Sequence, residues 1–347
     1  MKLISCACCL LFLVPAVAQD SSAASKISIS GFLDVYYQHD FNTPATKERP
    51  SFLYNHKQHA AFAVNLALLR VAYQDKKLKA TIGLMTGDYA QYNLAAEPRL
   101  LQHVYEANIG YHFSDKISME AGILPSHLGL ENAISKDCWN LSRSLLAENS
   151  PYFETGLRMN YAPGEKWQFS LLVLNGWQNI KETNTSKAIG TQVQFKPDDT
   201  WLFNSSGFAG NERTDSIAQA IRYFHNFYVT CAVSDKLKTA LLADVGTENK
   251  KTWWGTAFLL HYKAAAKFAT GLRFEYYKDR KGVIVTSYPP GEAAFTGISC
   301  NADYTPSSQL SFRAEARWLR AALPVFEKNG DLKNTNFCLL GSIAVSF

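Results

Sequence analysis

The sequence predicts an all-β fold: a transmembrane antiparallel up-and-down β-barrel of about sixteen strands. Three observations predict it. Apolar and polar residues alternate along long segments, short and long connections alternate between those segments, and the last segment carries apolar residues to the carboxyl end. Alternation with period two indicates strands, and segments of nine or more residues can cross a bilayer when tilted. A β-sandwich would also alternate, but its strands average only about five or six residues.

The amino-terminal segment MKLISCACCLLFLVPAVAQD predicts export. Lys2 precedes an apolar run over residues 3–14, and Ala16 and Ala18 frame a cleavage position. This pattern is typical of a secretory signal peptide over residues 1–18. The run is shorter than the roughly 20 residues that a spanning helix needs. We expect residues 19–347 to form one exported domain, because no linker or change of composition divides them.

Composition argues against several functional classes. Removal of Lys2 leaves 34 of the 35 Lys and Arg residues against 30 Asp and Glu, a formal net charge of +4. No basic block accompanies this small charge, so nucleic acid is not an expected partner. The four cysteines of the mature chain are scattered, which indicates neither a zinc site nor a disulfide framework. P-loop, GxGxxG, HExxH and EF-hand patterns are missing from the sequence, and we expect no cofactor and no metal.

Strands follow one another along the mature chain. Alternation is clearest in KISISGFLDVYYQHD (26–40), YEANIGYHF (105–113), ISMEAGILPS (117–126), TGLRFEYYK (270–278) and QLSFRAEARW (309–318). Two segments are weaker, because residues 60–74 break their alternation around 65–68 and residues 200–208 are few. Fourteen or eighteen strands are therefore alternatives to sixteen.

The connections between these segments alternate in length. Seven short turn-forming links lie near residues 75–77, 114–116, 163–166, 197–199, 234–236, 263–266 and 305–308. Eight mostly longer polar links lie near 41–59, 87–101, 128–151, 179–187, 208–220, 247–252, 279–294 and 320–335. Fifteen links imply sixteen strands, with both termini on the short-turn side. Outer-membrane barrels have this pattern of tight periplasmic turns and longer outer loops.

The carboxyl end has the pattern of a closing strand. In NFCLLGSIAVSF, Phe337, Leu339, Ile343, Val345 and Phe347 share one face. Lipid leaves no water for unpaired backbone groups, so the last strand must pair with the first. The ending also resembles the signal by which outer-membrane proteins are recognised for insertion. We therefore expect the barrel-assembly machinery and outer-membrane lipid as partners. A soluble edge strand docked in a core is the alternative.

Three stretches carry a more specific resemblance. GILPSHLGLENAISKDCWNLSRSLLAENSPYFETG (122–156), LLVLNGWQ (171–178) and RYFHNFYVT (222–230) are similar to the OmpL-like family of β-barrel porins of Gram-negative outer membranes. The resemblance implies a pore-forming barrel in the bacterial cell outer membrane with no catalytic residues. We expect passive diffusion of small polar solutes through a water-filled channel lined by mixed charges. General porins are commonly trimers, and here a homotrimer and a monomer both stand open.

A barrel of about sixteen strands encloses an aqueous channel, so the inward faces are the candidate site. The predicted pore-lining residues are Asp34, Glu106, Asn108, Glu120, Arg158, Asn160, Arg273, Glu275, Arg313, Glu315 and Arg317. Opposite charges two residues apart on one wall would form a filter for small polar solutes. Alternatively, these charges only solvate the lumen and neutralise one another.

The link at residues 128–151 is the most informative loop. DCWNLSRSLLAENSP is the best short helix candidate in the chain, with Pro151 as a stop. In general porins the loop after the fifth strand folds inward and narrows the pore. By resemblance, the candidate constriction residues are Glu131, Lys136, Asp137, Arg143 and Glu148. The alternative places this loop outside, packed on its neighbours.

Two other functional classes compete with transport. An outer-membrane protease or lipase would place His groups near the rim, where His39, His56, His59 and His127 lie, with Asp40 beside His39. The chain has no GxSxG motif, and a loop His beside an Asp is far more often solvated surface than a catalytic pair. A structural or adhesive surface protein is the third class, for which the sequence offers long loops but no repeat.

Overall fold

The structure is a computed structural model that describes residues 26–286 and 291–347, so the expected signal peptide lies outside it. Sixteen strands of this part close into one antiparallel barrel, which confirms the predicted fold. They are β1 (Ile27–Asp40), β2 (Phe62–Gln74), β3 (Leu78–Thr86), β4 (Val104–His112), β5 (Ile117–Pro125), β6 (Phe153–Tyr161), β7 (Trp167–Leu174), β8 (Ala188–Phe195), β9 (Trp201–Asn211), β10 (Ile221–Ala232), β11 (Leu237–Glu248), β12 (Lys251–Ala265), β13 (Phe268–Asp279), β14 (Ala293–Tyr304), β15 (Leu310–Ala321) and β18 (Thr335–Ser346).

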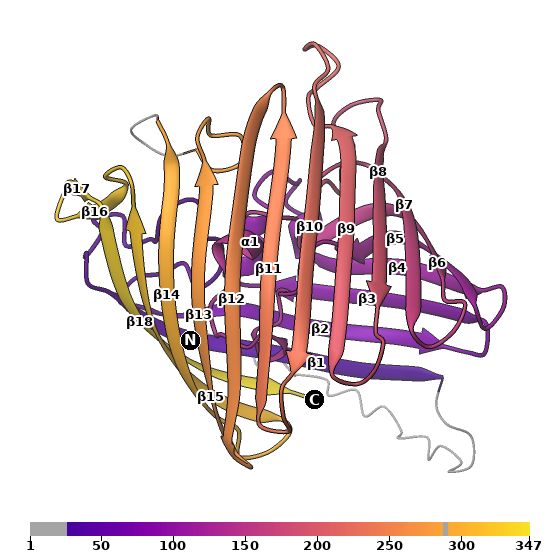
Figure 1. The fold of residues 1–347 in the computed structure, drawn as a ribbon, viewed down its shortest axis with the longest axis horizontal. Coiled ribbons are helices and arrows are strands. Elements are labelled where there is room, and N and C mark those ends of the chain that lie inside the picture. The colour runs from indigo at the N-terminus through magenta and orange to yellow at the C-terminus, as the bar shows by residue number, and fades with distance from the viewer. Residues whose placement is uncertain (1–25, 287–290) are drawn as a thin grey trace, which may run out of the picture.

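Each strand pairs with its neighbours in the chain, and β1 pairs with β18 to close the cylinder (Figure 1). A small hairpin, β16 (Phe326–Lys328) and β17 (Asp331–Lys333), stands apart in the link before β18. The described helices are α1 (Leu145–Glu148) and single turns at Tyr89–Asn93, Leu101–His103 and Ser135–Asp137. None of the helices in these described ranges is long and apolar enough to cross a membrane.

The weak alternation of β2 has a structural cause. The register between β1 and β2 shifts at Asp34 and Val35, opposite Leu66 and Val64. Asn65 lies between those two partners and its side chain is fully buried, as is that of Leu66. A bulge of this kind leaves one residue unpaired and lets two successive side chains avoid the outer face. The Asn65 Oδ1 atom then accepts from the backbone N–H of His56 at 2.8 Å.

One predicted long link is wrong. Residues 247–252 were expected as a polar loop, but β11 and β12 extend into it and leave only Asn249 and Lys250 between them. Both residues have positive φ, 48° and 61°. Two successive residues of positive φ form the hairpin turn whose twist matches that of the flanking strands. The alternation of apolar residues stops before the two strands reach their turn. The sequence pattern therefore predicts strands that are too short at this hairpin.

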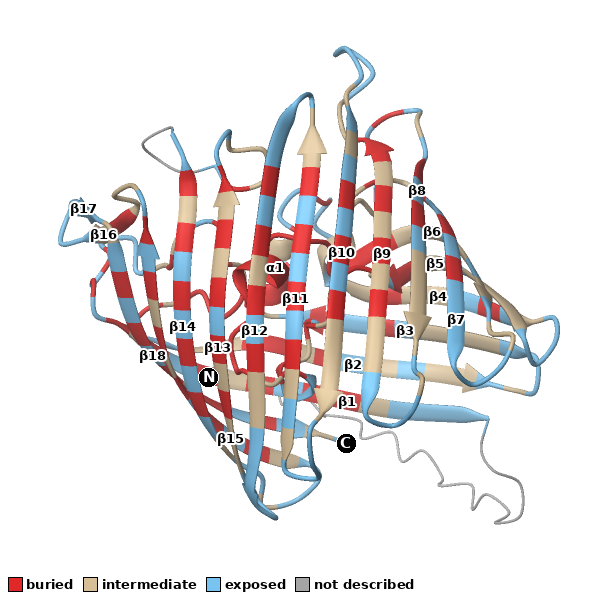
Figure 2. Ribbon diagram, in the orientation of Figure 1, coloured by how far each residue is buried: buried red, intermediate tan, exposed pale blue. Residues whose placement is uncertain are grey.

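Buried and exposed residues alternate along many strands of the barrel wall (Figure 2), and many of the exposed ones are large apolar residues. Outward residues such as Leu33, Ile82, Ile109, Leu171 and Ile343 are exposed, while their neighbours in sequence point inward. Aromatic rings stack at the short-turn end, including Trp167 on Phe195 at 4.2 Å and Phe268 on Tyr304 at 4.7 Å. Aromatic belts of this kind lie at the boundary of the hydrocarbon core in membrane barrels.

Phe347 completes the closing seam. Its backbone N–H donates to the Gly31 carbonyl at 3.1 Å, and its carbonyl accepts from the Gly31 N–H at 2.9 Å. The ring lies over Gly31, where a side chain would collide with it.

Deletion of Phe347 is expected to destabilise the barrel by roughly 1–3 kcal/mol, because two ladder hydrogen bonds are lost. The temperature at which the folded protein converts to its unfolded mobility on a detergent gel should fall. Phe347→Tyr keeps the backbone and an aromatic ring, so it should behave like the wild type. Equal temperatures for all three proteins would contradict the role given to this seam.

Candidate functional site: the barrel interior

A segment of residues 126–152 leaves β5, folds into the barrel and returns to β6; we call it the inward segment. Most of its side chains are buried, and α1 lies inside the cylinder (Figure 1). Carboxylates of the far wall accept two of its backbone N–H groups. Ser142 N donates to Glu315 Oε2 at 2.7 Å, and Leu145 N donates to Glu275 Oε2 at 2.6 Å. The segment is therefore fixed to strands β13 and β15.

Arginines of the same two strands complete this attachment, which we call the clamp. Arg273 Nη1 donates to the Ser142 carbonyl at 2.7 Å, and its Nη2 lies 3.4 Å from Glu315 Oε1. Arg317 Nη2 pairs with Glu275 Oε1 at 2.8 Å. All four charged side chains of the clamp are buried. Buried charges are tolerated when they are paired and hydrogen bonded, and removal of one partner is then costly.

Two further groups of the wall hold residues 135–138 of the segment. Arg313, paired with Asp303 at 2.9 Å, donates to the carbonyls of Ser135 at 2.6 Å and Cys138 at 3.1 Å. Asp34 of β1 accepts from the Ser135 hydroxyl at 2.8 Å. The segment thus bridges the first strand of the barrel and its late strands.

The start of the segment is anchored by His127. Its Nδ1 lies 2.8 Å from Glu154 Oε1, and its Nε2 lies 2.9 Å from the Gly207 carbonyl. The ring covers Gly190, where an added Cβ would approach the His127 Cε1 atom to 2.7 Å. Gln192 donates to the His127 carbonyl at 2.8 Å. The ring and the carbonyl of His127 therefore both contact the inner surface of β8 and β9.

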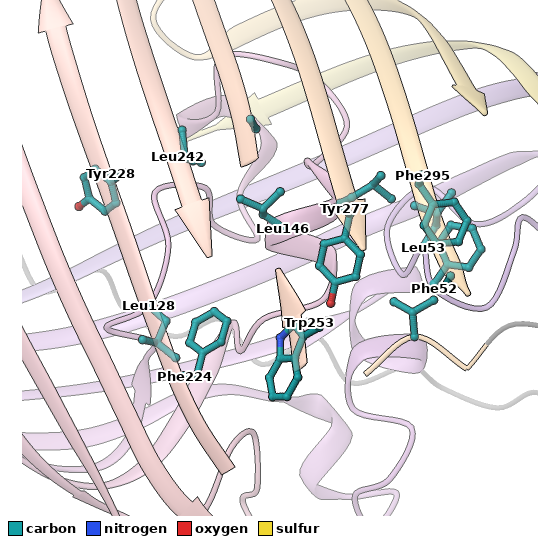
Figure 3. Close-up of a cluster of buried hydrophobic side chains, with 14 of the residues drawn as sticks. Phe52, Leu53, Leu128, Leu146, Phe224, Tyr228, Leu242, Trp253, Tyr277 and Phe295 are labelled. Atoms are coloured by element: carbon teal, nitrogen blue, oxygen red, sulfur yellow. The ribbon is translucent and has the colours of Figure 1, made fainter. Parts of the chain in front are cut away.

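Apolar contacts fill the space on both sides of the segment. On one side Leu128, Leu145 and Leu146 join a buried cluster with inward residues of β10 to β14 (Figure 3). On the other side Ala133 and Tyr152 join a cluster that includes Phe32, Leu66, Leu68 and Met85. In the half of the lumen toward the long loops, apolar side chains therefore pack on both sides of the inward segment.

A second inward stretch, residues 50–57, locks against the first. Glu148 accepts from Tyr54 N at 2.7 Å and from Asn55 Nδ2 at 3.3 Å. Lys57 Nζ donates to the carbonyls of Pro50 and Leu53 at 2.7 and 3.0 Å. Burial lowers the pKa of Lys57 to about 8, because desolvation disfavours an ammonium.

All eleven predicted pore-lining residues lie on inward faces, but they fall into two groups. Six are buried and contact the inward segment: Asp34, Arg273, Glu275, Arg313, Glu315 and Arg317. Glu106 is also buried and pairs with Arg70. The remaining four are partly exposed on β4, β5 and β6: Asn108, Glu120, Arg158 and Asn160.

The five candidate constriction residues also divide. Glu131, Arg143 and Glu148 are buried and stabilise the segment itself. Arg143, for example, donates to the carbonyls of Asn132, Leu141 and Ala133. Lys136 and Asp137 are exposed at the short-turn end, where Lys136 Nζ donates to the Ser308 carbonyl at 2.7 Å.

The helix expected within the segment is mostly wrong. Only Leu145–Glu148 forms an α-helix within the segment, with Ser144 accepting from Ala147 N at 3.2 Å as its N-cap. Carboxylates of the wall take the Ser142 and Leu145 N–H groups, and the Arg143 guanidinium takes nearby carbonyls. These partners replace the intrahelical bonds that a longer helix would need.

Three of the four rim histidines contact polar groups, and the ring of the fourth, His39, packs against Phe41 and His59. His56 Nε2 lies 3.2 Å from Asp34, His59 Nδ1 accepts from Asp40 N at 2.9 Å, and His127 contacts Glu154. Sequence reasoning did not single out Glu154, Ser142, Arg70 or Lys79. The available signal for the anchor is the Pro-Ser-His sequence at residues 125–127, inside the stretch 122–156 that resembles the OmpL-like family.

Among the long loops, Glu212 accepts from Trp177 N at 2.9 Å. Burial raises the pKa of its carboxyl to about 7, despite the nearby Arg222. Trp177 in turn packs edge-on against Phe208 and Phe224.

Because its pKa rises on folding, Glu212 binds a proton more tightly in the folded state. Stability should therefore fall as pH rises from about 4.5 to about 7. Glu212→Gln should flatten the change in thermal midpoint between pH 5 and pH 8. Glu292→Gln, at an exposed surface pair, is the control and should keep the wild-type dependence. An unchanged pH dependence in Glu212→Gln would refute the assignment.

Comparison with known proteins agrees with this architecture. Residues 26–347 match the family described as "Putative beta-barrel porin-2, OmpL-like". The chain belongs to this family. Within the stretches that resemble this family, Pro-Ser-His (125–127) and Asn-Ser-Pro-Tyr (149–152) lie at the two ends of the inward segment of the porin. Leu-Asn-Gly-Trp (174–177) contacts the loop residue Glu212 through the Trp177 N–H. No curated protein matches the sequence.

Solved structures share the fold of this porin at low identity. Salmonella typhi OmpF in complex with daunomycin has a TM-score of 0.63 and 10% identity, over 92% of this chain and 97% of that chain. OmpT of Vibrio cholerae has a TM-score of 0.61 and 8% identity, over 94% and 99%. An anion-selective porin from Comamonas acidovorans has a TM-score of 0.61 and 9% identity, over 92% and 99%.

Proposed function

We propose that this porin lets small polar solutes cross the outer membrane by passive diffusion, and that the inward segment sets the resistance of the path. One observation carries the proposal. The clamp fixes the inward segment to β13 and β15, and the wall of β4 to β8 keeps polar side chains exposed to the lumen. On β4 to β8 the inward side chains Asn108, Glu120, Arg158, Gln192 and Gln194 keep part of their surface exposed. Mixed charges remain there, with Lys79 and Arg158 near Glu120.

Bilayer recordings on refolded full-length protein test the proposal. Discrete conductance steps at neutral pH are expected, with small steps because much of the lumen is filled. Liposome swelling should be faster with small sugars and amino acids than with larger sugars. A closed barrel that shows neither conductance nor swelling would refute passive transport.

The absence of catalysis is part of the same proposal. His56, His59 and His127 bind structural partners inside the barrel, which supports a role in positioning loops. We expect no hydrolysis of phospholipid or of a generic peptide by the refolded protein. Turnover that is lost in His127→Ala would favour the enzyme alternative.

Export, membrane insertion and assembly complete the proposal. The signal peptide over residues 1–18 is cleaved, so the mature chain should begin at Gln19 by mass spectrometry of outer-membrane fractions. The exposed apolar band contacts outer-membrane lipid, and the strand that ends at Phe347 is read by the barrel-assembly machinery. The barrel assembles as a homotrimer, which cross-linking in native membranes tests directly.

A further inference from the structure

A cavity of about 460 Å³ opens at the short-turn end, between the tip of the inward segment and the wall of β12 to β15; we call it the short-turn cavity. The segment contributes Lys136, Asp137 and Trp139 to its lining. The wall contributes His261, Lys263, Lys267, Asp303 and Arg313. It is therefore built by both parts of the candidate site.

Charge in the short-turn cavity is unbalanced. Arg313 is neutralised by Asp303 at 2.9 Å. Lys136 donates to neutral acceptors, the Ser308 carbonyl and the Ser346 hydroxyl, so its charge is held in place without being cancelled. Lys263 and Lys267 are exposed lining residues, and Asp137 is the remaining carboxylate of the lining. The ammonium groups thus outnumber the carboxylates that remain to offset them.

Neighbouring groups strengthen this imbalance. Lys238 lies opposite His261 in the register of β11 and β12, and it adds another exposed ammonium to the inward face. The cavity at the long-loop end, of about 500 Å³, has the opposite balance: Asp40, Glu48 and Glu327 against Arg49 and Lys57. A concave surface lined by one sign of charge concentrates ions of the other sign.

An aromatic side chain accompanies the ammonium groups. Trp139 is partly exposed in the cavity, and its ring centre lies 6.0 Å from that of His261. An indole face offers apolar contact to a flat organic group, while an ammonium attracts a carboxylate. The two recognition elements suit one molecule that has both features.

We propose that the short-turn cavity binds small aromatic carboxylates. The carboxylate lies between Lys263 and Lys267, and the ring packs on Trp139. The inference rests on the proposed porin function for its consequence, which is a preference of the channel for organic anions. Binding itself can be measured without conduction.

Calorimetric titration of refolded full-length protein with benzoate tests the inference. The double variant Lys263→Gln/Lys267→Gln should weaken benzoate binding by about tenfold or more, because both ammonium groups that attract the carboxylate are lost. The double Lys→Arg variant should bind like the wild type. Lys251→Gln, at an exposed lysine of β12 on the long-loop end, is the matched control and should also bind normally.

Further arms separate the two recognition elements. Trp139→Ala should weaken benzoate more than acetate, and benzyl alcohol should bind far more weakly than benzoate. Equal binding of benzyl alcohol, unchanged affinity in the double Gln variant, or no benzoate binding at all would each overturn the inference. If benzoate binds as expected while bilayers show no conductance, the binding site stands and the porin proposal fails.

Discussion

Arg273→Ala is expected to raise the single-channel conductance severalfold. Arg273 is fully buried and faces three carboxylates, Glu131, Glu275 and Glu315. Removal of one partner from a buried ionic network costs about 3–5 kcal/mol. The unpaired carboxylates regain hydration at the lowest cost in free energy if the segment moves away from the wall and water reaches them. The lumen then widens where Ser142 now lies.

Matched variants separate this effect from simple unfolding. Arg320→Ala removes an exposed arginine of β15, the strand that carries Glu315 and Arg317 of the clamp, and should conduct like the wild type. Glu315→Gln keeps the shape of the side chain but weakens its bonds to Ser142 and Arg273, so a smaller increase is expected. Folded Arg273→Ala barrels with wild-type conductance would show that the clamp does not restrict the channel.

Gly190→Val is expected to displace the start of the inward segment without removal of any hydrogen-bonding group. The new side chain would occupy the place of the His127 ring, which lies against the strand there. Displacement of the ring from Gly190 separates His127 from the Gly207 carbonyl and from Gln192. Conductance should rise, and a protease should cut within residues 126–134 more readily than in the wild type.

Gly341→Val is the matched control. Gly341 lies on the outward face of β18, and an added Cβ meets no heavy atom within 4 Å. Folding, protease resistance and conductance should all match the wild type. If Gly190→Val behaves in the same way as this control, the His127 anchor does not hold the segment in place.

The barrel itself could be predicted because its signal is local. Strand alternation has a period of two, and each neighbouring pair lies close in sequence. The limits of this signal are visible at Asn65, where a bulge breaks the alternation, and at residues 247–252, where a hairpin extends past it. At both places, the polarity of a residue no longer indicates which face of the sheet its side chain occupies.

The roles of the interior charges could not be predicted in the same way. Ser142 and Glu315 are 173 residues apart, and Ser135 and Arg313 are 178 apart. Alternation shows that Arg273 and Glu315 point inward, but it does not show whether they meet water or a folded segment. The same limitation explains the helix error, because the partners of Ser142 N and Leu145 N come from distant strands.

The attachment of the inward segment constrains the order of assembly. The segment contacts β1, which precedes it, and β13 and β15, which are translated much later. The two sets of contacts can be complete at the same time only when the cylinder closes between β1 and β18, because Asp34 lies on one side of that seam and β13 and β15 lie on the other. The last step of folding therefore both seals the wall and encloses the segment.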